Sequence, residues 1–208
     1  MKNSSVWLHV KDQFIHQFAK NYYWTYANFL PQEVVDQLLN WAKNIEKDGL
    51  FRPAAIGKGA HRHENEEIRT DKIHWIDDFS GVEGQIVQDI FSGLQGLARE
   101  AFFLPAKRFE CHFAKYEPGS FYKLHQDRHV EKPGRLLTCV IYLGLDQPNQ
   151  GGELILYDEE LRQIRISPDP GRIVIFDSAI EHEVSRCKCN RWSLTGWIRS
   201  DIHPGIRL

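Results

Sequence analysis

Apolar residues recur along the first half of the chain with the period of an α-helix. The segment NFLPQEVVDQLLNWAKNI places Pro31 where a first helical turn would begin, and its apolar positions from Val34 to Ile45 form one stripe. The segment EGQIVQDIFSGLQGLAREAF, which begins at Glu83, repeats this pattern. We therefore predict two helices that brace one face of a β-sheet.

A Gly- and charge-rich segment, RPAAIGKGAHRHENEEIRTDKIHWIDD, lies between the two predicted helices. We interpret its second part, which contains Ile68, Asp71-Lys72-Ile73 and Trp75-Ile76, as an alternating strand. A polar insertion of this kind is more often a functional loop than a packed element. His61 and His63 would form a second metal site only if further donors lay nearby, so we interpret them as solvated loop residues.

From about residue 108 onward, short β-like runs alternate with turn residues. The turns contain EPGS, DQPNQGG and SPDPG, at the spacing typical of a double-sheet jelly roll or another small all-β sandwich. We predict a mainly β fold with flanking helices. In a single domain of 208 residues, a jelly-roll core over about residues 106–200 would be braced by a helical support over about residues 28–105.

The net charge and the hydropathy of the chain argue against two classes of partner, nucleic acids and membranes. With 26 basic and 28 acidic residues the formal net charge is -2, so the electrostatic basis for general nucleic-acid binding is missing. We find neither an apolar run that could span a bilayer nor the hydrophobic region of a signal peptide, and we expect a soluble cytoplasmic protein without a membrane partner. The cysteines suggest no disulfide framework, and we interpret Cys187 and Cys189 as a reduced hairpin tip rather than half of a zinc site.

The segment YEPGSFYKLHQDRHV carries the first candidate metal ligands. His125 and Asp127 are two positions apart, so in an extended segment their side chains project to the same face. His182 follows the apolar strand RIVIF. It lies 182 − 127 = 55 residues after Asp127, a separation long enough for strands to go out and return in a jelly roll. Two histidines and one carboxylate form the facial triad of non-haem Fe(II) oxygenases. Zinc hydrolases use the same ligand types, so the triad alone does not select the metal.

Arg191 is the residue that favours an oxygenase. If SRCKCN is the turn of a hairpin, Arg191 lies about opposite Ser185 and roughly 10 Å from His182 at ~3.3 Å per residue. A guanidinium at that distance could pair bidentately with the far carboxylate of a metal-chelated 2-oxo acid. Without the triad, a surface strand arginine would be the better interpretation.

Several motifs together resemble one family. IRTDKIHWID, YEPGSFYKLHQD, RLLTCVIYLG with the following GGELILY, GRIVIFDSAIEHEV and RWSLTGW are similar to motifs of the 2-oxoglutarate- and Fe(II)-dependent oxygenases, over about residues 51–199. Within that family the chain looks like the prolyl hydroxylases of the hypoxia-inducible-factor type and their bacterial relatives that modify elongation factor Tu. The resemblance implies a double-stranded β-helix, with Fe(II), 2-oxoglutarate and dioxygen as cofactors and ascorbate as a further one.

The resemblance also implies a cofactor-binding role for each matching residue. His125, Asp127 and His182 would hold the iron. Arg191 and Tyr142 would bind the far carboxylate of 2-oxoglutarate. Thr138 and Val140 would line the same strand face as Tyr142, because residues two apart share a face, and Tyr116 would lie over the near end of the cosubstrate.

Residues on the substrate side are implied in the same way. Trp197 would wall the pocket near the substrate. Arg69 and Asp71 would belong to the substrate loop, with Asp71 pairing with Arg135; the alternative is a surface ion pair of little energetic consequence. We expect Tyr122 to pack in the core, as aromatic strand residues normally do.

The resulting hypothesis is a 2-oxoglutarate- and Fe(II)-dependent dioxygenase that hydroxylates a prolyl residue of a protein, with elongation factor Tu as the candidate substrate and succinate as the coproduct. Two alternatives stay open. One is an oxygenase of the same superfamily that acts on a small molecule or a nucleic acid. The other is a non-catalytic jelly-roll sensor that binds 2-oxoglutarate or metal. The segment GKGAHRHENEE differs from the animal enzymes and looks closer to the bacterial ones.

Overall fold

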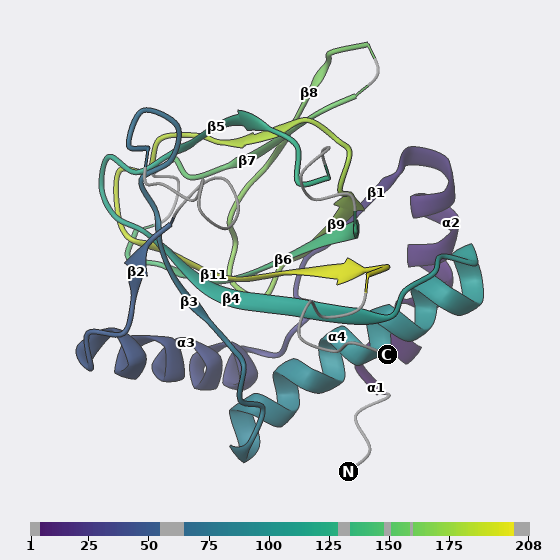
Figure 1. Ribbon diagram of the computed structural model, residues 1–208, viewed down its shortest axis with the longest axis horizontal. Helices are drawn as coiled ribbons and strands as arrows, with labels where there is room; N and C mark the ends of the chain where they lie inside the picture. Colours follow the sequence, from purple (N-terminus) through teal and green to yellow (C-terminus); the bar gives the residue numbers. More distant parts are fainter. Residues whose placement is uncertain (1–4, 55–64, 129–133, 148–150, 159, 202–208) are drawn as a thin grey trace.

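Two antiparallel β-sheets face each other at the centre of the computed structural model (Figure 1), which describes residues 5–54, 65–128, 134–147, 151–158 and 160–201. The seven-stranded sheet has the order β1-β9-β6-β11-β4-β3-β2 and the four-stranded sheet the order β5-β10-β7-β8. The predicted jelly-roll arrangement of a mainly β fold is confirmed. The strands are β1 (Tyr23–Tyr26), β2 (Arg52–Pro53), β3 (Lys72–Trp75), β4 (Arg108–Tyr116), β5 (Tyr122–His125), β6 (Arg135–Leu145), β7 (Leu154–Tyr157), β8 (Gln163–Ile166), β9 (Ile173–Asp177), β10 (His182–Val184) and β11 (Arg191–Arg199).

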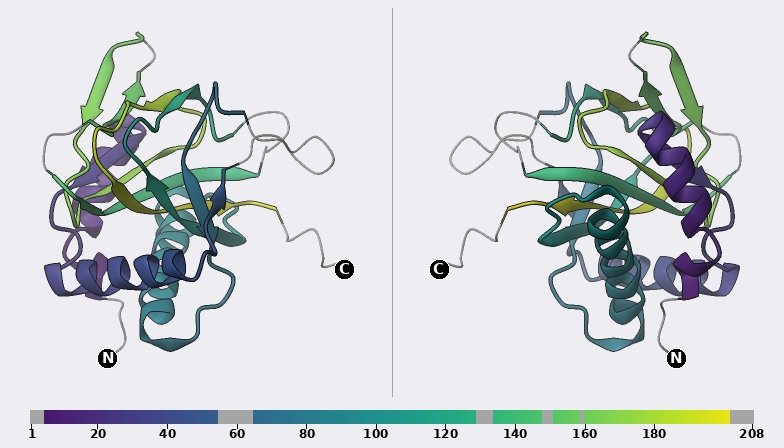
Figure 2. Two further views of the ribbon diagram at one scale, coloured as in Figure 1. Left: turned by 90° about the vertical axis from the view of Figure 1, so that its left-hand side faces the viewer. Right: turned by 90° about the vertical axis from the view of Figure 1, so that its right-hand side faces the viewer.

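The helices cover the outer face of the seven-stranded sheet (Figure 2). They are α1 (Ser5–Leu8), α2 (Lys11–Asn21), α3 (Gln32–Lys47) and α4 (Gly81–Phe102). α3 packs on β6, and α4 packs on β4 and β11, so both predicted helices brace one sheet face as expected. The segment that forms α1, α2 and β1 was not predicted, although it sends Phe14, Phe18 and Trp24 into the core.

Alternation along β6 separates two apolar clusters. Cys139, Ile141 and Leu143 face the helices in the main core, whereas Val140 and Tyr142 face the four-stranded sheet in a second cluster. Thr138 is also buried and shares the face of Val140. The predicted period of two is therefore confirmed, and it leaves one face of β6 for the space between the sheets. All four cysteines are free and buried.

Gly196 on β11 allows a close approach of helix α4. A Cβ atom built at this position would lie 2.6 Å from the Phe91 ring and 2.7 Å from the carbonyl oxygen of Glu110. We expect Gly196→Ala to lower the free energy of unfolding by about 1–3 kcal/mol, because neither neighbour has room to withdraw in a packed core. Thermal denaturation measures the change, at about 2–4 °C per kcal/mol for a chain of this size.

Gly96 provides the matched control, since a Cβ atom there would meet nothing within 4 Å. Gly96→Ala lies inside α4 and is expected to stabilise the protein by up to about 1 kcal/mol through helix propensity. Equal melting temperatures for the two variants would contradict the steric explanation.

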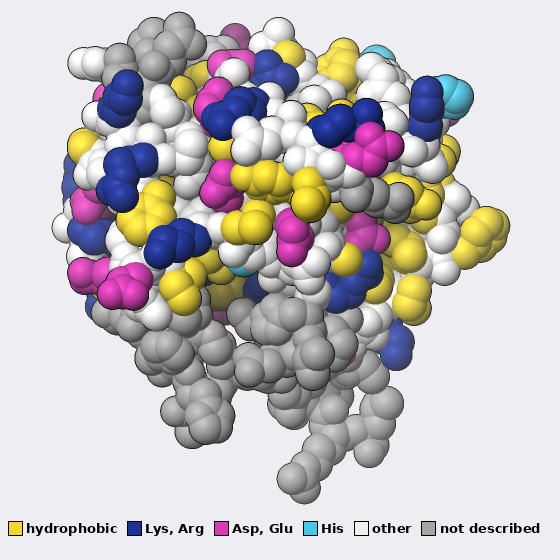
Figure 3. All heavy atoms as spheres, turned by 90° about the horizontal axis from the view of Figure 1, so that it is seen from above, with side chains coloured by type: hydrophobic (Ala, Val, Ile, Leu, Met, Phe, Trp, Pro, Cys, Tyr) yellow, Lys and Arg dark blue, Asp and Glu magenta, His cyan; other side chains and the backbone are white. Residues whose placement is uncertain are grey.

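The surface seen from above carries basic and acidic side chains interspersed with apolar ones (Figure 3). This mixture agrees with the near-zero net charge. Across the part of the chain that the structure describes, no helix has both the length and the apolar character needed to cross a membrane.

Candidate active site

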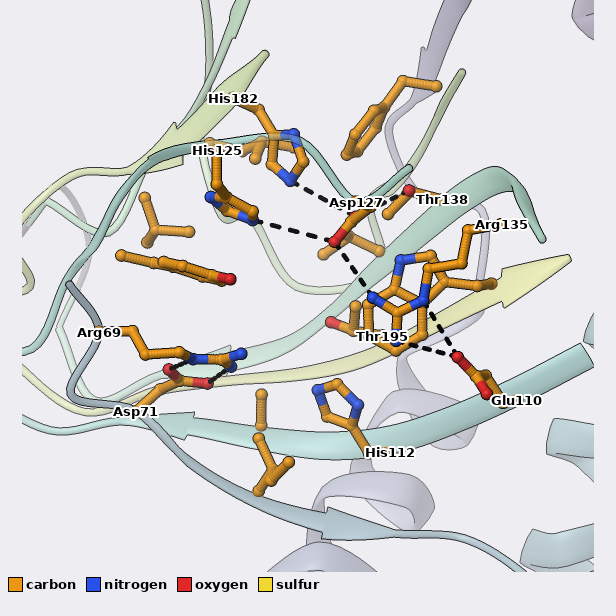
Figure 4. A pocket seen from close by; sticks show the side chains of 18 of the residues that line it. Arg69, Asp71, Glu110, His112, His125, Asp127, Arg135, Thr138, His182 and Thr195 are labelled. Atoms are coloured by element: carbon orange, nitrogen blue, oxygen red, sulfur yellow. Dashed lines mark hydrogen bonds and ion pairs between the residues drawn. The ribbon is translucent and has the colours of Figure 1, made fainter. Parts of the chain in front are cut away.

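Two histidines lie directly opposite each other on neighbouring strands of the four-stranded sheet. His125 on β5 pairs in register with His182 on β10, and their ring centroids are 4.1 Å apart. Asp127 follows β5, and its carboxylate oxygens lie 3.9 Å from His125 Nε2 and 3.5 Å from His182 Nε2 (Figure 4). One ligand atom from each residue lies within 4.8 Å of the others. The fold thus brings together the three candidate ligands that the sequence spacing suggested.

Backbone contacts set the tautomer of both histidines. Nδ1 of His125 lies 2.8 Å from the carbonyl oxygen of Lys123, and Nδ1 of His182 lies 2.9 Å from that of Ile180. A carbonyl only accepts, so each Nδ1 carries the proton and each Nε2 presents its lone pair toward Asp127. Burial lowers the pKa of His125 well below its ordinary value, and His182 lowers it further. The neutral imidazole is the form that binds a metal ion.

Asp127 is held ionised in a buried position. Burial alone would raise the pKa of Asp127, but His182, Arg135 and His125 together hold that pKa well below its ordinary value. Thr138 Oγ1 donates to Oδ2 over 2.8 Å, and Arg135 Nη1 lies 3.4 Å from Oδ1. Two imidazole nitrogens and one oriented carboxylate fit a divalent ion of the iron type, with coordination positions left for other ligands.

Thr138 supports the carboxylate without being a ligand itself. We expect Thr138→Val to weaken Fe(II) binding by about 10–100-fold, because loss of a hydrogen bond to a metal ligand frees that ligand to rotate. Anaerobic Fe(II) titration measures the effect. Thr25→Val is the matched control, since the Thr25 hydroxyl donates to the carbonyl of Ile173 on the β1–β9 pair, outside the cavity lining. Equal Fe(II) affinities in the two variants would contradict this role.

Arg191 occupies the opposite wall, on β11 of the seven-stranded sheet. Its guanidinium carbon lies 4.7 Å and 4.8 Å from the ring centroids of Tyr116 and Tyr142. Arg191 is buried, no carboxylate of a described residue forms an ion pair with it, and its Nε and the Tyr142 hydroxyl are buried without a hydrogen-bond partner. A buried cation with unused donors is costly unless an anion pairs with it. This corner therefore fits the carboxylate of a small 2-oxo acid.

A cavity of about 340 Å³ between the two sheets joins these features. The triad, Arg191, Tyr116, Thr138, Val140, Trp197, Arg69 and Asp71 all line it, whereas Tyr142 lies buried beside Arg191. Sequence reasoning missed other residues that line the cavity. They are Ile73, Trp75, Glu110, His112, Ala114, Gln126, Leu154, Phe176, Val184, Thr195 and Arg199.

The expected hairpin around SRCKCN is wrong. Arg191 pairs with Tyr116 and Leu145 in the seven-stranded sheet, whereas β10 with His182 belongs to the four-stranded sheet. The connection crosses from one sheet to the other, and Cys187 within it is buried rather than exposed at a tip. Arg191 therefore faces the histidines across the cavity instead of along one ladder.

The expected Asp71–Arg135 pair is also wrong. Asp71 accepts two hydrogen bonds from Arg69, at 2.8 Å and 2.5 Å, and is 1% exposed, so the pair is not a surface ion pair either. Arg135 instead binds Glu110 over 2.9 Å and approaches Asp127. The partners differ because Arg69 is only two positions from Asp71, whereas Glu110 lies nearer to Arg135 on the other side of the cavity (Figure 4).

Tyr122 packs against a small apolar cluster that includes Ile73 and Val184, as expected, but it also lines the cavity. Its ring stacks on His125 at 3.5 Å between centroids, and the Arg69 guanidinium carbon lies 4.2 Å above it. Aromatic strand residues usually pack inside, but β5 is an edge strand with one face toward the cavity. His61 and His63 lie outside the described residues.

The 2OG-Fe(II) oxygenase superfamily matches residues 111–199 of the chain, a range that contains the triad and Arg191. A PKHD-type hydroxylase of Synechocystis sp. is 29% identical over 112 residues, which cover 45% of this chain and 37% of that protein. The chain thus spans well under half of that relative.

Solved structures give more complete matches. A prolyl-4-hydroxylase of Pseudomonas putida superposes with a TM-score of 0.83 and 31% identity, covering 91% of this chain and 99% of that one. A prolyl hydroxylase of Trichoplax adhaerens, solved with a peptide of hypoxia inducible factor, has a TM-score of 0.80 and 24% identity, covering 92% of this chain and 90% of that one. Given the near-complete overlap with the bacterial structure and the triad that the fold assembles, the chain belongs to the 2OG-Fe(II) oxygenases, and within them to the prolyl 4-hydroxylase type.

Proposed function

We propose that this chain is a 2-oxoglutarate- and Fe(II)-dependent dioxygenase that hydroxylates a prolyl residue of a protein. The proposal rests on two groups that face each other across the cavity. One wall holds the His-Asp-His cluster. The other holds the buried Arg191, which has no carboxylate partner among the described residues. A metal ion and a dicarboxylate would together satisfy both walls.

In this proposal His125, Asp127 and His182 hold the iron, and Arg191 pairs with the far carboxylate of 2-oxoglutarate. Tyr116 and Tyr142 flank the guanidinium with their rings. Val140 and Trp197 keep water out of the cavity with apolar surface.

Iron and 2-oxoglutarate, when bound, would supply the oxidation: one oxygen atom of O₂ would enter a C–H bond of the substrate, and the other would enter succinate as CO₂ leaves. The chain's own side chains bind, orient and shield. No side chain has to remove a proton from carbon, so the residues around the triad need fixed geometry rather than a tuned general base.

The substrate part of the proposal rests on likeness and on the cavity walls. One structural neighbour is a prolyl-4-hydroxylase, and another binds a peptide of hypoxia inducible factor. The Arg69–Asp71 pair contributes to the wall of the cavity. We take bacterial elongation factor Tu as the candidate substrate, in a cytoplasmic setting, with ascorbate as a stimulating reductant.

The test is peptide mass mapping of bacterial elongation factor Tu after incubation with the iron-loaded protein, with and without 2-oxoglutarate. A 2-oxoglutarate-dependent gain of one oxygen on a proline would support both the reaction and the substrate. Omission of ascorbate in a parallel sample tests whether it stimulates turnover.

Other outcomes separate the alternatives. Succinate release without a modified proline would retain the oxygenase and discard this substrate, which leaves a different protein, a small molecule or a nucleic acid. The formal net charge of -2 gives no general electrostatic attraction for a nucleic acid, which disfavours that substrate. Binding of 2-oxoglutarate with no succinate under air would contradict the enzyme and favour a sensor.

A further inference from the structure

His112 is a buried polar side chain that the roles above do not use. It lies on β4 and is 4% exposed. Its ring rises into the cavity between the Arg69–Asp71 pair and the Arg135–Glu110 pair (Figure 4). Nδ1 is buried and has no hydrogen-bond partner among the described residues. Because an unpaired buried nitrogen destabilises a fold, such an atom in a cavity wall indicates a site for a ligand group.

Two tryptophans hold the imidazole in place. The Trp75 ring meets it edge to face at 4.9 Å between centroids, and the Trp197 ring lies at 5.3 Å. All three side chains line the same cavity. The Trp197 Nε1 atom is likewise buried without a hydrogen-bond partner among the described residues. Aromatic walls with a few polar atoms suit a ligand that combines a rigid apolar ring with a hydrogen-bonding group.

The charged groups beside His112 are already engaged. Arg69 donates twice to Asp71, and Arg135 donates twice to Glu110, over 3.1 Å and 2.9 Å. Burial, followed by the nearby charges of Arg69 and Arg135, lowers the pKa of His112 well below its ordinary value. The ring is therefore neutral and has one donor and one acceptor to offer.

A prolyl residue presents a matching surface. Its ring is apolar and rigid, and it lacks an amide N–H, so the carbonyl oxygen is the only main-chain hydrogen-bonding atom that it offers. We propose that His112 is a substrate-recognition residue that donates a hydrogen bond to the main-chain carbonyl of the target residue and positions its ring beside Trp75 and Trp197. This inference rests on the proposed function, because it assumes a peptide substrate.

The test uses three proteins and a probe that does not depend on knowing the substrate. A library of twelve-residue peptides with a fixed central proline is selected against the wild-type protein loaded with Zn(II) and 2-oxoglutarate, so that binding occurs without turnover. The affinity of one selected peptide is then measured for wild type, His112→Phe and His112→Gln. Phenylalanine keeps the ring between the tryptophans, whereas glutamine keeps a hydrogen-bond donor.

We expect His112→Phe to bind the peptide about tenfold more weakly, as loss of one buried hydrogen bond implies, and His112→Gln to recover part of the loss. Affinity for 2-oxoglutarate and the melting temperature should stay close to those of wild type in both variants. A peptide with a thioamide at the prolyl carbonyl, a weaker acceptor, should lose affinity for wild type but not for His112→Phe.

Two results would overturn the role of His112. One is equal peptide affinity in wild type and His112→Phe; the other is a parallel loss of peptide affinity, 2-oxoglutarate affinity and melting temperature, which indicates a structural role. If the library yields no peptide that binds wild type, the proposed protein substrate itself is wrong. That result is distinct, because it appears before any variant is compared.

Discussion

Replacing Asp127 by alanine is expected to remove Fe(II) binding and to reduce 2-oxoglutarate-dependent turnover to background. The variant leaves two imidazoles, which form an incomplete site for Fe(II). It also takes away the acceptor that orients Thr138 and contacts Arg135. Asp127→Asn keeps the shape but not the charge, so we expect a loss of the same order, with a smaller change in melting temperature.

The measurements are Fe(II) titration under anaerobic conditions and succinate release under air. Asp169→Ala is the matched control, because Asp169 is exposed and pairs with Arg172 outside the cavity. Full turnover in Asp127→Ala would remove the triad from the proposal, whereas loss of turnover in Asp169→Ala would mean that the assay reports stability.

Replacing Arg191 by methionine is expected to have opposite effects on ligand binding and on stability. Loss of a buried charged partner costs about 2–5 kcal/mol of binding free energy, which raises the KM for 2-oxoglutarate roughly thirtyfold or more. The ligand-free protein should become more stable, by about 1–4 kcal/mol, because a buried charge without a counterion is replaced by an apolar side chain of similar length.

Arg199 offers a close comparison on the same strand and the same face. It is also buried, but it binds Glu110 over 2.7 Å and Asp201 over 2.7 Å. Arg199→Met should therefore lower the melting temperature and leave the KM for 2-oxoglutarate near that of wild type. If Arg191→Met destabilises the ligand-free protein as Arg199→Met does, Arg191 has a structural counter-charge and the carboxylate site is wrong.

The helices and strands that could be predicted from the sequence are those in which apolar residues repeat with one clear period over the whole element. β6 is buried on both faces, yet the apolar run with Thr138 and Tyr142 on one face already suggested which side meets a ligand. The two long helices follow from stripes that a helix of 3.6 residues per turn brings onto one side. α2 carries a sparser stripe, through Phe14 and Phe18, which a wider window could have detected.

The partners that could not be predicted depend on how distant segments cross. Whether the chain after Ser185 returns along the same sheet or moves to the other depends on contacts between distant segments, and no local sequence pattern indicates the outcome; Cys187, within this connection, is buried. The ion pairs Arg69–Asp71 and Arg135–Glu110 also could not be predicted from a local pattern. Glu110 and His112 could have been predicted to line the cavity, because they alternate along β4 with the same period of two as Tyr116 and so share its face.

Strands β4, β6 and β11 each turn one row of side chains toward the helices and the other toward the cavity. One row packs in the core and the other lines the cavity, so a substitution in the cavity row need not disturb the packing of the core row. For an enzyme engineer this makes the middle of β4 the place to begin altering selectivity. His112 and Ala114 can be varied there while Cys111 and Phe113, one step along the backbone, continue to hold the scaffold together.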